Sequence, residues 1–188
     1  MKYRLTNETI RLGRRILHRI ECVETFADVE VGDKGGWIGE EGNLSQEDGA
    51  WVYGNAKVYG NAQVYDHAEV YGNAEVRGNA KVYGNALVYD YAVVYDSAQI
   101  YDCAVVNGYA VATGDAKISQ GSDYIVFKNN FSSGRYFTWT RSNNMWAVGC
   151  FYGTGEELIK KARQDSEEKA KCYALYVKLV EDLQKVKL

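Results

Sequence analysis

Apolar residues recur with a strict period of six between residues 50 and 118. An aliphatic side chain returns every six positions from Val52 to Ile118, and only Ala112 breaks that column. An alanine stands two positions before each of these residues. Six residues do not match the 3.6-residue period of an α-helix, but they fit a short strand followed by a tight turn. The chain is therefore organised around an internal repeat, which predicts a stack of similar structural units.

Each repeat reads Ala-x-Val-Tyr and continues with a pair such as Gly-Asn or Asp-Ser. Residues in a strand alternate between its two faces, so Ala and Val point inward while x and Tyr point outward. Gly, Asn and Asp favour turns, and three such corners close a triangular coil of 18 residues. Twelve repeats from Val52 to Asp123 predict four coils at about 4.8 Å each, or roughly 20 Å of prism. The mainly β fold expected is a parallel β-helix over residues 50–122.

Residues 1–49 are expected to form an N-terminal β cap and a worn first coil. The segments Lys2–Thr6 and Arg15–Val23 indicate short strands. Ile38 and Leu44 then fall in phase with the repeat, although the residues around them follow it poorly. A cap is expected here because the open end of a β-helix is an unpaired edge.

The period stops after Ile118, and residues 123–188 are expected to form a β-meander followed by two helices. Aromatic-rich stretches at Tyr124–Phe131, Arg135–Arg141 and Met145–Tyr152 predict three strands, because turn residues separate them. The helix signals come next along the chain.

Thr154 and Glu157 have the spacing of a capping box, which predicts the start of the first helix. Residues 165–168 resemble a second helix start, and a helical spacing of apolar residues follows to Lys185. That stripe predicts packing rather than a cofactor site, and it consists of Tyr173, Tyr176, Val177, Val180 and Leu183.

The charge of the 188-residue chain is slightly negative, with a formal net charge of −3. This balance does not favour general nucleic-acid binding. The charges are unevenly spread, since the first twenty residues are basic while Val52–Asp123 carries four basic and eight acidic residues. We interpret the basic segment as the solvated surface of a cap and the acidic segment as the solvated surface of the prism.

The four cysteines are scattered and form no CxxC pair, so we expect no zinc site, metal or cofactor. The N-terminus lacks the apolar segment of a signal peptide, and no stretch approaches the ~20 apolar residues of a membrane span. We therefore expect a cytoplasmic protein with reduced thiols and no membrane association. The cysteines are Cys22, Cys103, Cys150 and Cys172.

The repeat resembles hexapeptide-repeat proteins, in which an aliphatic residue is followed four positions later by a small one. That resemblance implies a left-handed parallel β-helix, whereas general crossover handedness would favour a right-handed one. The main structural competitor is the right-handed coil of five-residue repeats, but the period here is six without slippage.

The flanking motifs are similar to those of phage and prophage proteins described as hexapeptide transferase-like or polymer-forming. The similar segments are Gly35–Ile38, Asn43–Ser45, Trp51–Ala56 and Gly149–Thr154. This resemblance covers nearly the whole chain and implies a phage setting, in the host cytoplasm, without implying one activity.

Acyltransferases are the largest class with this prism, and the resemblance therefore keeps an enzyme as one alternative. The resemblance implies that such enzymes are trimers in which a histidine near a subunit seam acts as the base. Their acyl donor is acyl-CoA or acyl carrier protein. His67, the one histidine of the repeat, lies at a corner, and no long loop nearby would hold an acceptor. Cys103 shares that corner two coils away, roughly 10 Å, which is too far for a nucleophile–base pair. We predict no catalytic residue, and a structural role for His18.

The corner that contains Asp48, Asp66 and Asp102 is acidic, although Gly84 interrupts it. A carboxylate row of this kind could mimic nucleic-acid phosphates. We favour the alternative that these residues stabilise the turns through hydrogen bonds to their own backbone.

Stacking every eighteenth residue places one apolar and aromatic patch on the third and fourth coils, where the earlier coils are polar. We predict a self-association surface there, giving a dimer or trimer, unless the terminal helices fold back over it. The patch consists of Leu87, Tyr89, Tyr91, Val93, Tyr95, Val105, Tyr109 and Val111.

The function expected from these features is that of a non-enzymatic, phage-type binding protein. It would be an oligomeric scaffold or inhibitor that binds a host or defence component, in the manner of an anti-CRISPR protein. The alternatives are a hexapeptide acyltransferase-like enzyme and a self-assembling structural protein.

Overall fold

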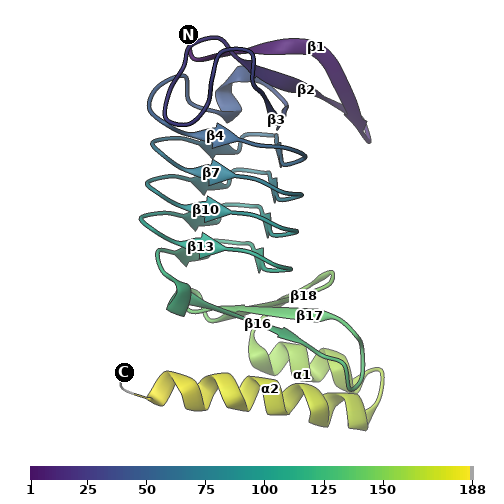
Figure 1. Cartoon of the computed structure of the whole chain (residues 1–188). Coiled ribbons are helices and arrows are strands. Elements are labelled where there is room, and N and C mark those ends of the chain that lie inside the picture. Colours follow the sequence, from purple (N-terminus) through teal and green to yellow (C-terminus); the bar gives the residue numbers. More distant parts are fainter. Residues whose placement is uncertain (187–188) are drawn as a thin grey trace.

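A computed structural model describes residues 1–186 of the chain, and a solenoid of parallel strands forms its centre (Figure 1). A β-hairpin and a further strand close one end of the solenoid, and an antiparallel sheet with two helices closes the other. Within residues 1–186, no helix is both long enough and apolar enough to cross a membrane.

The solenoid consists of short strands in three parallel sheets, and each sheet takes one strand from every coil. The β4 sheet has the order β13-β10-β7-β4, the β6 sheet has the order β15-β12-β9-β6, and the β5 sheet runs from β3 through β5, β8 and β11 to β14. The strands are β4 (Trp51–Val52), β5 (Lys57–Val58), β6 (Gln63–Val64), β7 (Glu69–Val70), β8 (Glu75–Val76), β9 (Lys81–Val82), β10 (Leu87–Val88), β11 (Val93–Val94), β12 (Gln99–Ile100), β13 (Val105–Val106), β14 (Val111–Ala112) and β15 (Lys117–Ile118).

The inward and outward faces of the repeat lie as the alternation predicts. Every alanine from Ala50 to Ala116 is buried, as is the aliphatic column that ends at Ile118. The coils are in register at a spacing of 18 residues, so that Leu87 lies beside Val105. The parallel β-helix is therefore confirmed, and its left hand stays a prediction.

The corners depend on a residue in the left-handed backbone region, which Gly and Asp supply. Asp66 has a φ of 58° and Gly72 a φ of 68°. The carboxylate of Asp66 accepts a hydrogen bond from the backbone N–H of Gly84 in the next coil, at 3.0 Å. Asp96 accepts a similar bond from Gly114. Of the predicted acidic corner, Asp66 therefore bonds the neighbouring coil rather than its own turn, which corrects the role predicted for that residue.

The N-terminal region contains an antiparallel hairpin, formed by β1 (Tyr3–Leu12) and β2 (Arg15–Cys22). Strand β2 also pairs with β3 (Lys34–Ile38), and β3 continues as the first strand of the β5 sheet. Leu44, which follows the short η1 helix (Glu41–Asn43), bridges to Val64. The worn first coil is thus confirmed. Strand β1, however, extends six residues beyond the predicted Thr6 to pair with β2.

The first coil exposes backbone carbonyls at the N-terminal end of the solenoid, and donor side chains bond to them. Lys2 is buried, and its Nζ donates to the carbonyl oxygen of Ala50 at 2.7 Å. Asn43 donates through Nδ2 to the carbonyl oxygen of Ala62 at 2.9 Å. Hydrogen-bond donors therefore close this end of the solenoid, because the backbone groups exposed there are acceptors.

The last coil exposes backbone N–H groups instead, and hydroxyl groups accept from them. Val111 donates to Oγ1 of Thr138 at 2.9 Å, and Lys117 donates to Oγ of Ser142 at 2.7 Å. Both hydroxyls belong to the C-terminal sheet, so this sheet acts as a cap for the solenoid.

The C-terminal sheet has four antiparallel strands rather than the three expected, because the last predicted strand turns at Gly149. This glycine has a φ of 61°, and the chain reverses there into a fourth strand. The sheet follows the η2 helix (Gly121–Asp123). Its strands are β16 (Tyr124–Lys128), β17 (Tyr136–Thr140), β18 (Met145–Val148) and β19 (Phe151–Gly153).

Two helices follow, α1 (Gly155–Arg163) and α2 (Glu167–Lys185), and they pack on the face of the sheet that is turned away from the solenoid (Figure 1). The predicted capping box is confirmed, since Thr154 Oγ1 accepts from the N–H of Glu157. Ser166 caps α2 in a similar way. Tyr173, Val177 and Val180 are buried against the sheet as predicted, but Leu183 is exposed.

Candidate interaction surface

The eight residues of the predicted patch lie on two neighbouring sheets and the corner between them. Leu87 and Val105 are adjacent on the β4 sheet, and Val93 and Val111 are adjacent on the β5 sheet. Tyr91 and Tyr109 follow one another at the shared corner. The structure therefore brings these side chains together through the register of the coils.

An aromatic column forms the most exposed part of this patch. Tyr91 and Tyr109 stack with ring centroids 5.1 Å apart, and Tyr136 of the C-terminal sheet stacks on Tyr109 at 4.2 Å. Tyr91 remains 54% exposed and Tyr109 remains 47% exposed. The other six patch residues are each partly buried by their neighbours in the coil. Tyr91 and Tyr109 are therefore more exposed than the other six side chains of the patch.

A charged group borders the patch on the β5 sheet. Arg77 pairs with Glu75 at 2.8 Å, and its guanidinium carbon lies 4.1 Å from the ring centroid of Tyr95. Glu75 also accepts a hydrogen bond from the hydroxyl of Tyr59 at 2.5 Å. This hydrogen bond and burial raise the pKa of Tyr59, with burial the larger cause.

The C-terminal sheet, rather than the terminal helices, meets the patch at its other border. Tyr136 stacks on Tyr109, and the hydroxyl of Tyr124 donates to the carbonyl oxygen of Val105 at 3.0 Å. The helices lie beyond this sheet and leave the patch open (Figure 1). The fold-back alternative is therefore wrong, because the sheet is interposed between the solenoid and the helices.

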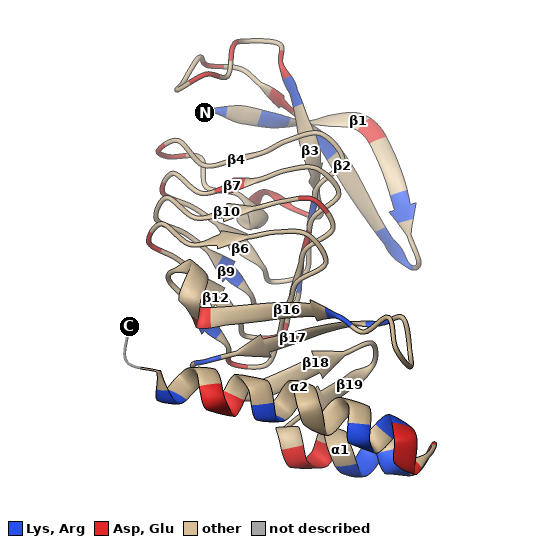
Figure 2. Ribbon diagram, turned by 60° about the horizontal axis from the view of Figure 1, so that its bottom comes forward, with Lys and Arg blue, Asp and Glu red and all other residues tan. Residues whose placement is uncertain are grey.

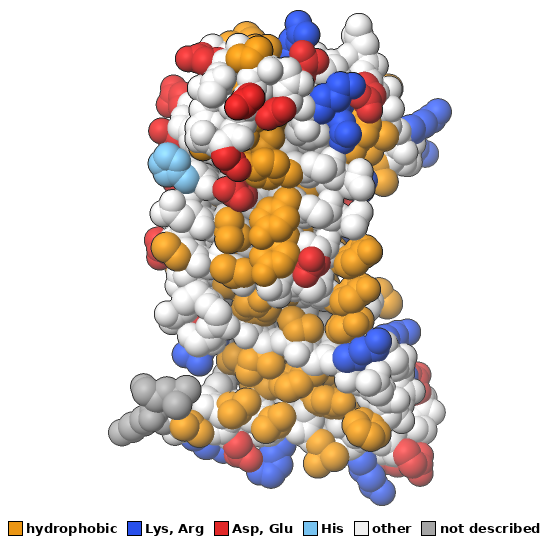
Figure 3. All heavy atoms as spheres, in the orientation of Figure 1, with side chains coloured by type: hydrophobic (Ala, Val, Ile, Leu, Met, Phe, Trp, Pro, Cys, Tyr) orange, Lys and Arg blue, Asp and Glu red, His pale blue; other side chains and the backbone are white. Residues whose placement is uncertain are grey.

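Apolar side chains gather along the face of β7, β10 and β13 and again over the C-terminal part of the molecule (Figure 3). Helix α2 carries a second exposed row that the sequence did not predict, and the row includes Leu183, which was expected to be buried. The row consists of Leu175, Leu179 and Leu183. Leu175 is 70% exposed. The signal was present in the sequence as a spacing of four residues, but it was masked by the buried stripe of the same helix.

Stacked tyrosines also line the other faces of the prism. Tyr65, Tyr83 and Tyr101 follow one another on the β6 sheet, with centroid distances of 4.9 and 5.3 Å. Burial raises the pKa of Tyr65 and of Tyr83, and the neighbouring phenol adds to the shift. These ladders are continuous, rigid surfaces with polar tips.

The histidines and the cysteine weighed as catalytic candidates lie at separate places in the fold. His67 is exposed at its corner, where its ring packs against Gly49. Cys103 is exposed at the same corner two coils further on. His18 lies in β2, and its Nδ1 is 3.1 Å from the carbonyl oxygen of Thr6. Within residues 1–186, no group of three or more His, Cys, Asp or Glu side chains could hold a metal ion.

Comparison with known proteins supports the repeat architecture. Residues 80–96, at the centre of the solenoid, match the family model described as the YdcK β-solenoid repeat. A search of curated proteins finds no match to the chain. The matched segment overlaps the third coil, which carries part of the patch.

Proposed function

Because the chain is a β-solenoid repeat protein, we propose that it is a non-enzymatic binding protein that acts through the outer surface of its coils. The observation that carries this proposal is the patch of eight apolar and aromatic residues on the third and fourth coils. Contiguous exposed apolar surface of this kind marks interaction sites, because a soluble protein otherwise minimises it. Tyrosine is also enriched among the residues that dominate binding energy.

The occupant proposed for this patch is a second copy of the chain. Parallel prisms can pack along a corner, and the exposed column of Tyr91 and Tyr109 runs along such a corner. A closed dimer or trimer would bury this column together with the six half-buried residues of the patch. The hydrogen-bonded caps at both ends of the solenoid support a closed assembly over an end-to-end filament, and so disfavour a self-assembling structural protein.

A partner from the host or its defence systems is proposed for the remaining surface. The proposal rests on the resemblance of the flanking motifs to phage proteins, and it places the protein in the host cytoplasm as a scaffold or inhibitor. The stacked tyrosines of the β6 sheet provide a long surface suited to such binding, because side chains that are already ordered lose little freedom when a partner binds. We propose no cofactor for this activity.

Light scattering on the purified protein tests the assembly. We expect the wild type to have the mass of two or three chains, and the variant Tyr91→Asp with Val93→Asp to have the mass of one. The control Gln63→Asp with Asn85→Asp adds the same charge on exposed positions of the β6 face and its corner. Circular dichroism establishes that all three proteins are folded. A monomeric wild type, or an assembly that persists in the patch variant, would refute the proposal.

A further inference from the structure

The hairpin of β1 and β2 projects from the side of the solenoid as a two-stranded arm (Figures 1 and 2). Its strands pair in register from Thr9 beside His18 to Leu12 beside Arg15. Gly13 and Arg14 form the two-residue turn, and Gly13 has the positive φ of 60° that such a turn requires. The tip is thus a well-defined β-ribbon.

The two faces of the arm differ in what they meet. Arg11 lies beside Ile16 on the outer face, because residues opposite one another in register share a face. Ile16 is 58% exposed. On the inner face, Leu17 is buried, and the guanidinium of Arg15 lies 5.4 Å from the ring centroid of Tyr59. The outer face therefore presents the apolar side chain of Ile16 next to the cation of Arg11.

The arm concentrates positive charge that the net charge of the whole chain conceals. From Thr9 to Ile20 it contains four arginines and no acidic residue. Among residues 1–186, Arg11, Arg14 and Arg15 form no ion pair. In Figure 2 the ribbon at the end of the hairpin has the blue colour of Lys and Arg. Arg15 packs over Tyr59 on the inner face, so the guanidinium groups of Arg11 and Arg14 are the ones that the tip offers to an anionic partner.

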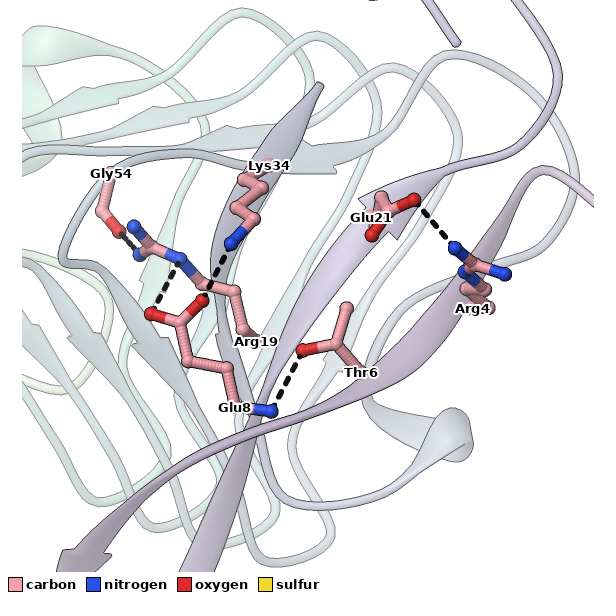
Figure 4. A network of polar contacts seen from close by, with 7 residues as sticks. All are labelled: Arg4, Thr6, Glu8, Arg19, Glu21, Lys34 and Gly54. Atoms are coloured by element: carbon pink, nitrogen blue, oxygen red, sulfur yellow. Dashed lines mark hydrogen bonds and ion pairs between the residues drawn. The ribbon is translucent and has the colours of Figure 1, made fainter. Parts of the chain in front are cut away.

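The base of the arm is held firmly against the solenoid, as Figure 4 shows. Arg19 donates to the carbonyl oxygen of Gly54 at 2.7 Å, and its guanidinium carbon lies 4.7 Å from the ring centroid of Trp37. The carboxylate of Glu8 lies between Arg19, at 3.8 Å, and Lys34, at 2.9 Å. These contacts fix the direction of the arm, so little ordering is needed when a partner binds its tip.

We propose that this arm is a docking element for duplex DNA and that its tip enters the major groove. The major groove of B-form DNA admits a two-stranded β-ribbon, and guanidinium groups match phosphate geometry. Ile16 would make apolar contact within the groove, for which the thymine methyl group is suited. Duplex RNA does not fit, because its major groove is too deep and narrow.

The acidic prism limits this interaction to the arm. The repeats from Val52 to Asp123 carry an excess of acidic residues and repel phosphates. The outer face of the arm, which carries Arg11 and Ile16, is turned away from that surface, so a chain of net negative charge can hold DNA there. This inference goes beyond the proposed function and does not depend on it.

Fluorescence anisotropy with a labelled 20-base-pair duplex DNA tests the inference. At 25 mM salt we expect saturable binding by the full chain, and a plot of log K against log salt with a slope near −1.8, which is about 0.9 for each of Arg11 and Arg14. The variant Arg11→Glu with Arg14→Glu should bind more than tenfold more weakly. Ile16→Ser should weaken binding severalfold with an unchanged salt slope.

A matched control separates the arm from general electrostatics. Lys81→Glu with Lys117→Glu makes the same change of charge at exposed positions of the solenoid, and we expect its affinity to fall less than threefold. Absence of wild-type binding at 25 mM salt would overturn the inference. So would equal losses in the arm and control variants, or equal affinity for duplex RNA of the same sequence.

Discussion

The alanine of each repeat sets the size of the residue that the interior of the solenoid accepts. Three sheets meet around a narrow core in which every member of this column is fully buried. Packing in such an interior is close to that of a crystal, so an added group has no space to occupy. The outward neighbour of each alanine is free of this restriction.

A pair of adjacent substitutions tests this distinction. Ala80→Leu should destabilise the fold by about 1–3 kcal/mol or more, because Ala80 is fully buried and overpacking strains the coil. Lys81→Leu should cost little, since Lys81 is exposed. Urea denaturation gives both values. Equal losses of unfolding free energy would contradict the assignment of inner and outer faces.

Lys2 is a buried cation, and its titration links stability to pH. Burial lowers its pKa from 10.5 to about 8, with the Asp48 carboxylate opposing the shift. Between these values the unfolded chain binds the proton and the folded chain does not, so this contribution to stability increases with pH. It is complete above pH 10.5 and is lost as the pH falls through 8.

The variant Lys2→Met isolates this effect, because both proteins keep the same tyrosines and α-amino group. From pH 7 to pH 9.5 the wild type should gain about 1–2 kcal/mol of unfolding free energy relative to the variant. Urea midpoints at the two pH values provide the measurement. Parallel pH dependences for the two proteins would show that Lys2 keeps its ordinary pKa.

At the scale of elements, each end of the solenoid is closed by groups of the complementary hydrogen-bonding type. Parallel coils leave carbonyls free at one end and N–H groups at the other, and a cap has to match this polarity. The ammonium of Lys2 serves the first end, and the hydroxyls of Thr138 and Ser142 serve the second. The caps are therefore specific to their ends and not interchangeable.

Replacing the hydroxyl of Thr138 by a methyl group tests the C-terminal cap. Thr138 is buried, and Thr138→Val leaves the N–H of Val111 without its acceptor, which should cost about 1–3 kcal/mol. Thr9→Val is the matched control on an exposed strand position. Hydrogen exchange of the Val111 amide should accelerate in the first variant alone. An unchanged exchange rate would contradict the capping role.

The elements that the sequence predicted well are those with a strong period. Six-residue spacing defined the faces and registers of the coils, and the stacking of every eighteenth residue predicted which patch residues are neighbours. Strand β1 was underestimated because residues on both of its faces are partly exposed, so its pattern does not alternate clearly. The fourth C-terminal strand was missed because Gly149 was interpreted as part of a strand rather than a turn.

The exposure of the patch was less predictable than its position. The ring of Tyr71 stacks on Tyr89 and the guanidinium of Arg77 covers Tyr95, so both are half-buried. The C-terminal sheet contributes Tyr136 to the aromatic column. That contact joins residues far apart in the chain and depends on how the cap is oriented. The periodic pattern contains no information on either point.

At the scale of the whole molecule, the uniform coils bear on whether the protein could be an acyltransferase. The strands from β4 to β15 follow one another at constant spacing, without an inserted loop to enclose an acceptor. His67 is exposed at its corner, where its ring lies beside Gly49. A general base needs its acceptor held within hydrogen-bonding distance, and this corner offers no such enclosure.

Titration calorimetry with acetyl-CoA tests the consequence on the intact protein. We expect no heat beyond dilution, and no acetyl transfer to amine or hydroxyl acceptors, because a convex corner buries too little of a ligand to bind it. The variant His67→Ala should behave as the wild type does in both assays. Saturable binding of acetyl-CoA, together with acetyl transfer that His67→Ala abolishes, would favour the enzyme. An oligomer would not change this expectation unless His67 lay at its subunit seam. The patch proposed for assembly lies on the corner between the β4 and β5 sheets, whereas His67 lies on the corner between the β6 and β4 sheets.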